Sequence, residues 1–76
     1  QTLEIVYERK GRGCHPATIV VCPQGMADND VDTLAGTLRR RLGVGGSARG
    51  GEILLQGDRR DALHTILPGL GFKTKG

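Results

Sequence analysis

Three groups of cationic side chains give this sequence its clearest chemical potential. They lie at 9–12, where they flank Gly11, at 39–41, and at Arg59 and Arg60. Arginine and lysine bind phosphate by charge, and arginine adds a planar fork of N–H donors. Glycine lets the backbone approach a phosphate closely. These residue types indicate contacts with a polyanion, and the formal net charge of +3 agrees with that interpretation.

Each group also has an interpretation that requires no ligand. The segment 9–12 could be the solvated tip of a hairpin. The run at 39–41 falls where a helix is expected to end, and cations there complement the helix dipole. This run spreads over about 200° of helix, so we expect one or two of its side chains to contact the same ligand. Arg59 and Arg60 fall in an expected first helical turn, where the dipole disfavours cations, and this hints at a partner.

Cysteine and histidine could in principle supply metal or nucleophilic chemistry. Structural zinc sites usually pair cysteines about two to four residues apart, and this sequence has no such pair. Neighbouring side chains on an extended loop point apart, which argues against Cys14 and His15 as a nucleophile and its base. A disulfide between Cys14 and Cys22 is geometrically possible, although cytosolic proteins rarely keep one. His64 completes the set of residues considered, and we predict no metal site.

Glycine-rich and aromatic signals are weaker. The segment 43–47 follows an expected helix and lacks the lysine of a phosphate-binding loop, so it is interpreted as a turn. The aromatic residues are Tyr7 and Phe72. Readers of single-stranded nucleic acid stack bases on several aromatic rings. We therefore expect shape and phosphate contacts with folded RNA, and we expect both rings in the core.

The hydrophobic pattern predicts the strands that must position these residues. Alternation over 3–8 and a β-branched run at 17–21 predict two strands that flank a long basic loop. Gly50 and Gly51 are typical of a primed hairpin turn, which needs positive φ. The remaining strands are expected at 47–49, 52–56 and 72–75.

Two apolar stripes at helical spacing predict two helices. The first runs from Val31 to Leu42, with Asp28 or Asp30 as its N-cap and Gly43 as its C-terminal glycine.

The second helix carries its stripe at 63–70, with Asp58 as N-cap and Asp61 as capping-box partner. Proline lacks a backbone N–H and clashes within a helix. Pro68 is therefore expected to end or distort this helix near Leu67.

The resulting order is strand-strand-helix-strand-strand-helix-strand. It predicts an α+β two-layer sandwich, with two helices on one face of a mostly antiparallel sheet of four to five strands. The 76 residues fit a single domain, 1–76. No apolar run approaches the roughly 20 residues of a membrane span, and two cysteines fit a reducing compartment, so we expect a cytoplasmic protein. Gln1 already lies in a strand pattern, and we expect a natural N-terminal tail to be missing.

The ordered series of motifs resembles translation initiation factor 1 of eukaryotes, archaea and their bacterial homologues. A Gly-Glu-Ile strand at 51–53 followed by Leu-Gln-Gly-Asp-x-Arg at 55–60 contributes most. The other similar segments are the basic loop 9–13, the helix end 38–43, the glycine turn 45–47 and the closing strand 71–73. The short turn at 50–51 and the segment 14–16 depart from the eukaryotic pattern.

This resemblance implies a monomeric factor that binds the small ribosomal subunit near the decoding site and promotes accurate start-codon selection. It implies that the basic loop and the first helix face ribosomal RNA, with initiator tRNA and other initiation factors as further candidate partners. The candidate RNA-binding residues are Arg9, Lys10, Gly11, Arg12, Arg39, Arg40, Arg41, Arg59 and Arg60.

Two other function classes stay open at this point. The first is an RNA- or protein-interaction domain cut from a larger translation or recycling factor, which the strand pattern at Gln1 suggests. The second is an enzyme. Scattered carboxylates and the absence of an evident pocket argue against it, and we predict no catalytic residue and no cofactor. Turnover abolished by Cys14→Ala would revive it.

Overall fold

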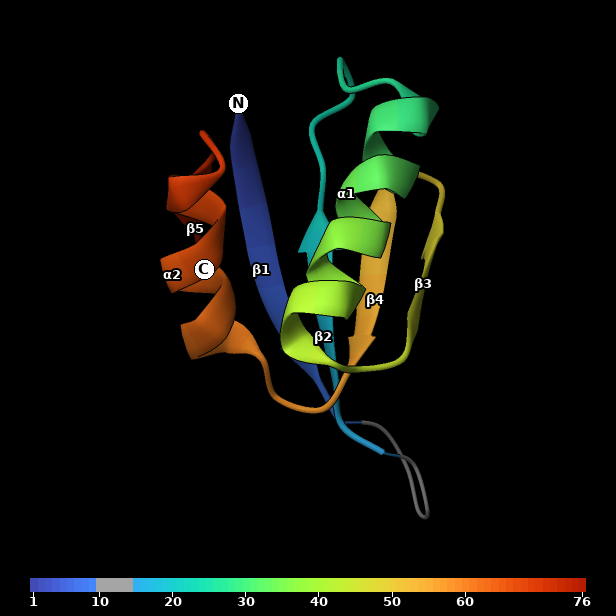
Figure 1. Cartoon of the computed structure of the whole chain (residues 1–76), viewed down its shortest axis with the longest axis vertical. Coiled ribbons are helices and arrows are strands. Elements are labelled where there is room, and N and C mark those ends of the chain that lie inside the picture. The colour runs from blue at the N-terminus through green and yellow to red at the C-terminus, as the bar shows by residue number, and fades with distance from the viewer. Residues whose placement is uncertain (10–14) are drawn as a thin grey trace.

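Two helices cover one face of a mixed five-stranded sheet in the described part of the chain (Figure 1). The computed structural model describes residues 1–9 and 15–76. The elements are β1 (Thr2–Glu8), β2 (Ala17–Val21), α1 (Asp28–Leu42), β3 (Gly46–Arg49), β4 (Glu52–Gln56), α2 (Arg60–Gly69) and β5 (Lys73–Lys75). The strand order is β3-β4-β2-β1-β5; β1 and β5 are parallel, and the other neighbouring pairs are antiparallel. The predicted α+β two-layer fold is confirmed.

The core lies between the sheet and the helices. Alternate residues of the central strands point into it, as the period of two in a strand requires. The helices contribute apolar residues three and four positions apart. Among the described residues, the most deeply buried apolar side chains are Leu3, Val20, Leu38, Ile53, Leu55, Leu63 and Leu67. Phe72 packs against this cluster from a half-buried position. Tyr7 is half-buried at the end of β1, so the prediction that its ring belongs to the core is wrong.

The predicted side-chain cap of α1 is wrong. The N-cap is Ala27, with no side-chain hydrogen bond, and Asp28 and Asp30 lie inside the first turn. Met26 precedes the cap and Val31 is the fourth helical residue, which are the positions of a hydrophobic staple, and both are buried. Burial of the entering chain therefore sets the start of the helix, and the aspartates act through the helix dipole.

The predicted start of α2 is wrong by one residue. Its N-cap is Arg59, with no side-chain cap bond, so Asp58 lies outside the helix and Asp61 completes no capping box. The helix was expected to end or distort near Leu67, and α2 ends two residues later, at Gly69, with Pro68 inside its last turn. A proline in the last turn removes only its own N–H, and the N–H of the following Leu70 closes the turn on the carbonyls of residues 66 and 67.

The turns agree with the sequence. Gly43 ends α1 with φ of 65°, a left-handed conformation in which glycine carries no Cβ penalty. Gly50 and Gly51 join β3 to β4 with φ of 59° and 78°, as the predicted primed turn requires. The predicted strands at 17–21 and 52–56 are confirmed, while β3 begins one residue before the predicted start and β5 one residue after it.

Candidate RNA-binding surface

The described arginines singled out by the sequence lie toward one end of the molecule. Glu8 pairs with Ala17, and Ala17 pairs with Gln56, so this row marks the end of the sheet where the β1–β2 loop leaves. α1 ends there, and the segment from β4 to α2 crosses there (Figure 1). We call this region the basic end. Its cationic residues are Arg9, Arg39, Arg40, Arg41, Arg59 and Arg60.

A buried hydroxyl ties the turn before α2 to the sheet. Thr18 is fully buried on β2, and its Oγ1 donates to the Gly57 carbonyl at 2.7 Å. The same oxygen accepts the Arg59 backbone N–H at 2.8 Å. The Gly57 N–H donates to the Pro16 carbonyl at 2.8 Å. These contacts hold Arg59 beside the start of β2. The prediction missed Thr18, whose only signal is a polar side chain on the core-facing side of an apolar strand.

Two arginines of the basic end are fixed by carbonyl groups. Arg59 Nε donates to the Gln56 carbonyl at 2.9 Å, so its side chain folds back over the end of β4. Arg39 Nη1 donates to the Gly46 carbonyl at 3.0 Å and joins the last turn of α1 to β3. These bonds place no opposite charge beside either guanidinium group, because a carbonyl is neutral. Both groups therefore remain suited to anions.

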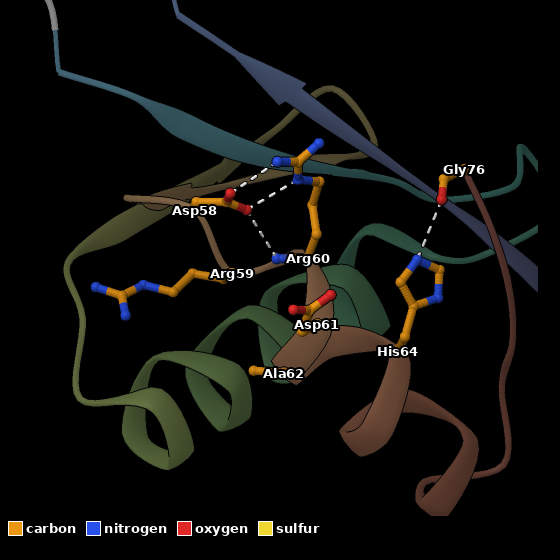
Figure 2. Close-up of a pocket in the computed structure, with 7 residues that line it drawn as sticks. All are labelled: Asp58, Arg59, Arg60, Asp61, Ala62, His64 and Gly76. Atoms are coloured by element: carbon orange, nitrogen blue, oxygen red, sulfur yellow. Dashed lines mark hydrogen bonds and ion pairs between the residues drawn. The ribbon is translucent and has the colours of Figure 1, made fainter.

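Arg60 has a different environment. Its Nε and Nη2 donate to Asp58 Oδ1 and Oδ2 at 2.9 and 2.8 Å, and its backbone N–H lies 3.3 Å from Oδ1 (Figure 2). Its guanidinium carbon lies 4.4 Å from the centroid of the Tyr7 ring, within cation–π range. The hydrogen bonds from Arg60 lower the pKa of Asp58, and the same bonds raise the pKa of Arg60. Arg60 is thus held between a carboxylate and a ring.

The remaining predicted residues divide into two groups. Arg9, Arg40 and Arg41 are exposed, and Arg40 Nη1 lies 3.3 Å from where a Cβ at Gly36 would stand, so this side chain runs back along α1. Lys10, Gly11 and Arg12 lie outside the described residues, as does Cys14, and their predicted roles stay predictions.

A shallow polar hollow of about 510 Å³ opens beside Arg60. Figure 2 shows its lining residues, which are Asp58, Arg59, Arg60, Asp61, Ala62, His64 and Gly76. His64 Nδ1 lies 2.9 Å from Thr74 Oγ1, and its Nε2 lies 3.2 Å from the Gly76 carbonyl. These contacts connect α2 to the strand segment that follows it.

The other chemistry considered from the sequence finds little support in residues 1–9 and 15–76. No group of three or more His, Cys, Asp and Glu side chains there could hold a metal ion. Cys22 is a buried thiol, and burial raises its pKa, which disfavours the reactive thiolate. Within the same residues, neither helix is long and apolar enough to cross a membrane.

Comparison with known proteins decides the family. The model of the family described as "Translation initiation factor SUI1" matches residues 1–73. The chain belongs to the SUI1 family of translation initiation factors. The expected likeness to initiation factor 1 is thereby confirmed, and the family is one of translation factors without enzymatic activity.

SUI1 relatives occur in archaea and bacteria. A "Protein translation factor SUI1 homolog" of Pyrococcus abyssi is 44% identical over 88% of this chain and 67% of its own length. An uncharacterized protein of Haemophilus influenzae is 37% identical over 88% of this chain and 59% of its own length. The uncharacterized protein YciH of Escherichia coli is 34% identical, with 88% and 58% covered. The chain thus spans less than two thirds of the length of these bacterial relatives.

Proposed function

We propose that this SUI1 domain binds the small ribosomal subunit near the decoding site and promotes accurate start-codon selection. The basic end would contact phosphates of folded ribosomal RNA, and the protein would act in the cytoplasm by occupying its site. Initiator tRNA and other initiation factors are further candidate partners. No step of this function requires the domain to make or break a covalent bond.

The observation that carries the proposal is the placement of the cations. Cations that stand far apart in the sequence, directly after β1, in the last turn of α1 and at the start of α2, lie toward the same end of the sheet. Arg39 and Arg59 are already oriented by carbonyl groups that leave their charge available. Arginines that are already held in place suit a rigid array of phosphates, because they lose less side-chain entropy on binding than mobile arginines would.

Co-sedimentation with purified small ribosomal subunits, at two salt concentrations, tests this proposal. The variant Arg9→Ala/Arg41→Ala removes two exposed cations from the basic end. Each lost phosphate contact should reduce the slope of log affinity against log salt by about 0.7–0.9. We expect weaker binding with a smaller slope.

The matched control is Arg49→Ala/Lys73→Ala. These two exposed cations lie toward the other end of the sheet, since Arg49 pairs with Glu52 and Lys73 pairs with Thr2. Both double variants lose two positive charges, so a difference between them reports position rather than net charge. Equal losses in the two variants would contradict the assignment to the basic end, and absence of native binding would reject the proposal.

A second candidate is an RNA- or protein-interaction domain of a longer translation or recycling factor. The greater length of the bacterial relatives favours it, because the matched region is only part of those proteins. Comparing small-subunit binding by residues 1–76 with binding by the complete gene product separates the two candidates. Equal affinity favours a self-sufficient factor, whereas binding only by the longer product favours the second candidate.

A further inference from the structure

We propose that Arg60 is a base-stacking residue, whose guanidinium plane, backed by Tyr7 and held by Asp58, receives an unpaired base of the RNA. This inference rests on the proposed function and gives one of its residues a distinct role. The other arginines of the basic end would bind phosphates by charge, whereas Arg60 would act through its shape.

The charge of Arg60 is poorly placed for a phosphate. Two of its N–H donors point at the Asp58 carboxylate, at 2.9 and 2.8 Å. A phosphate that approached would meet this carboxylate and would have to compete for the same donors. Asp61 lines the same hollow, so two carboxylates oppose Arg59 and Arg60 there. The hollow therefore lacks the net positive field that attracts anions.

The same contacts make Arg60 a good flat surface. The guanidinium carbon lies over the Tyr7 ring, 4.4 Å from its centroid, and the Nε and Nη2 groups are held by Asp58. The side chain nevertheless keeps 47% of its exposure. With the Tyr7 ring on one side and Asp58 at Nε and Nη2, the guanidinium is open on the side away from the ring and at Nη1. RNA bases that are splayed out of helices stack on arginine planes as well as on aromatic rings.

The hollow beside Arg60 suits a neutral, hydrogen-bonding ring. Its volume of about 510 Å³ lies beside a side chain that is already ordered, so little conformational entropy would be lost on stacking. Tyr7 does not line the hollow, which agrees with the ring lying behind the guanidinium. The carboxylates of Asp58 and Asp61 can accept hydrogen bonds from the amino groups of a base, which they could not do with a phosphate.

The variant Arg60→Lys tests the role of shape, because lysine keeps the charge and loses the plane. Its binding to purified small ribosomal subunits is compared with that of the native chain, at several salt concentrations. Base-specific chemical probing of the ribosomal RNA is read in parallel with a backbone footprint. Arg49→Lys, the same replacement on β3 at the other end of the sheet, is the control.

We expect Arg60→Lys to bind roughly tenfold more weakly, from the usual strength of base stacking. The slope of its log affinity against log salt should equal the native slope. One base of the ribosomal RNA should lose its protection from the chemical probe, and the backbone footprint should persist. A misfolded variant would lose the whole footprint, so a merely structural role of Arg60 is distinguished. Native affinity of Arg60→Lys, or its weaker binding without loss of base protection, would overturn the stacking role alone. Failure of the native chain to bind would overturn both proposals.

Discussion

The hydroxyl of Thr18 shows how a residue without charge can position charged ones. Its oxygen serves two backbone groups of a segment about 40 positions further along the chain, the Gly57 carbonyl and the Arg59 N–H. Both bonds lie in a partly buried region, where water replaces lost partners poorly. The path of the chain into α2, and with it the location of Arg59 and Arg60, depends on this contact.

Thr18→Val should therefore destabilise the domain. Valine has a similar shape and leaves the Arg59 N–H without its partner, and an unsatisfied buried group costs about 1–3 kcal/mol. We expect the midpoint of thermal unfolding to fall by roughly 5–15 °C.

Thr18→Ser keeps the hydroxyl and loses only a methyl group, so it should remain closer to the native chain. Differential scanning calorimetry of both variants measures the effect. Equal stability of the valine variant and the native chain would show that the two bonds contribute nothing net.

Contacts between residues that are distant in the sequence could not be predicted, whereas the local runs of cations could. The cationic groups were visible because they are local runs, but the sequence did not predict that Arg59 and Arg60 lie at the same end as the other two groups. The partners of Thr18 and the pairing of Tyr7 with Arg60 join residues that stand more than 38 positions apart. No local pattern encodes such contacts, so the site's fixed geometry could not be predicted.

At the scale of elements, the strands and the helix interiors followed from periodicity, while the helix starts did not. The strand at 17–21 and the turn at Gly50 and Gly51 were predicted correctly, because alternation and positive φ are local properties. The N-caps at Ala27 and Arg59 depend on tertiary contacts. Burial of Met26 sets the first, and the Thr18 bond holds the second. Local capping preference is weaker than either contact.

Gly46 provides a test of how β3 supports the basic end. A Cβ at Gly46 would collide with the Leu54 carbonyl of the paired strand β4, and the carbonyl of Gly46 is the acceptor for Arg39. Gly46→Ala should force the two strands apart and cost about 1–3 kcal/mol, the usual range for overpacking. Denaturant unfolding measures the loss.

Gly25→Ala is the matched control for this substitution. Nothing lies within 4 Å of the Cβ position of Gly25, and its φ is not in the left-handed region. The control should be neutral or slightly stabilising, because alanine restricts the unfolded chain. Similar losses in both variants would show that the close approach of β3 to β4 is not what restricts position 46.

At the scale of the whole molecule, α1 connects regions of opposite charge. Asp28, Asp30 and Asp32 lie near its start, and the arginine run lies in its last turn. Ten helical residues span about 15 Å, which is close to two screening lengths at physiological salt. The carboxylates therefore weaken the field of the basic end only slightly, and they offset the positive charge of Arg49 and Lys73 at the far end.

Replacing these three aspartates by asparagine should relax the selectivity of binding. The variant has a higher net positive charge, so its affinity for an unrelated RNA duplex should rise severalfold at low salt and fall back as salt is raised. Its affinity for small ribosomal subunits should change less. Filter binding with the RNA duplex and with small ribosomal subunits measures the two affinities. An unchanged affinity for the duplex would show that the acidic region has no part in selectivity.

The margins of the sheet have a consequence for how the domain behaves in a crowded solution. The outermost strands, β3 and β5, contain four and three residues, and β5 carries Lys73 and Lys75. A short edge with lysines offers few free backbone groups and repels a second copy that approaches edge to edge. Strand addition between molecules is thereby discouraged.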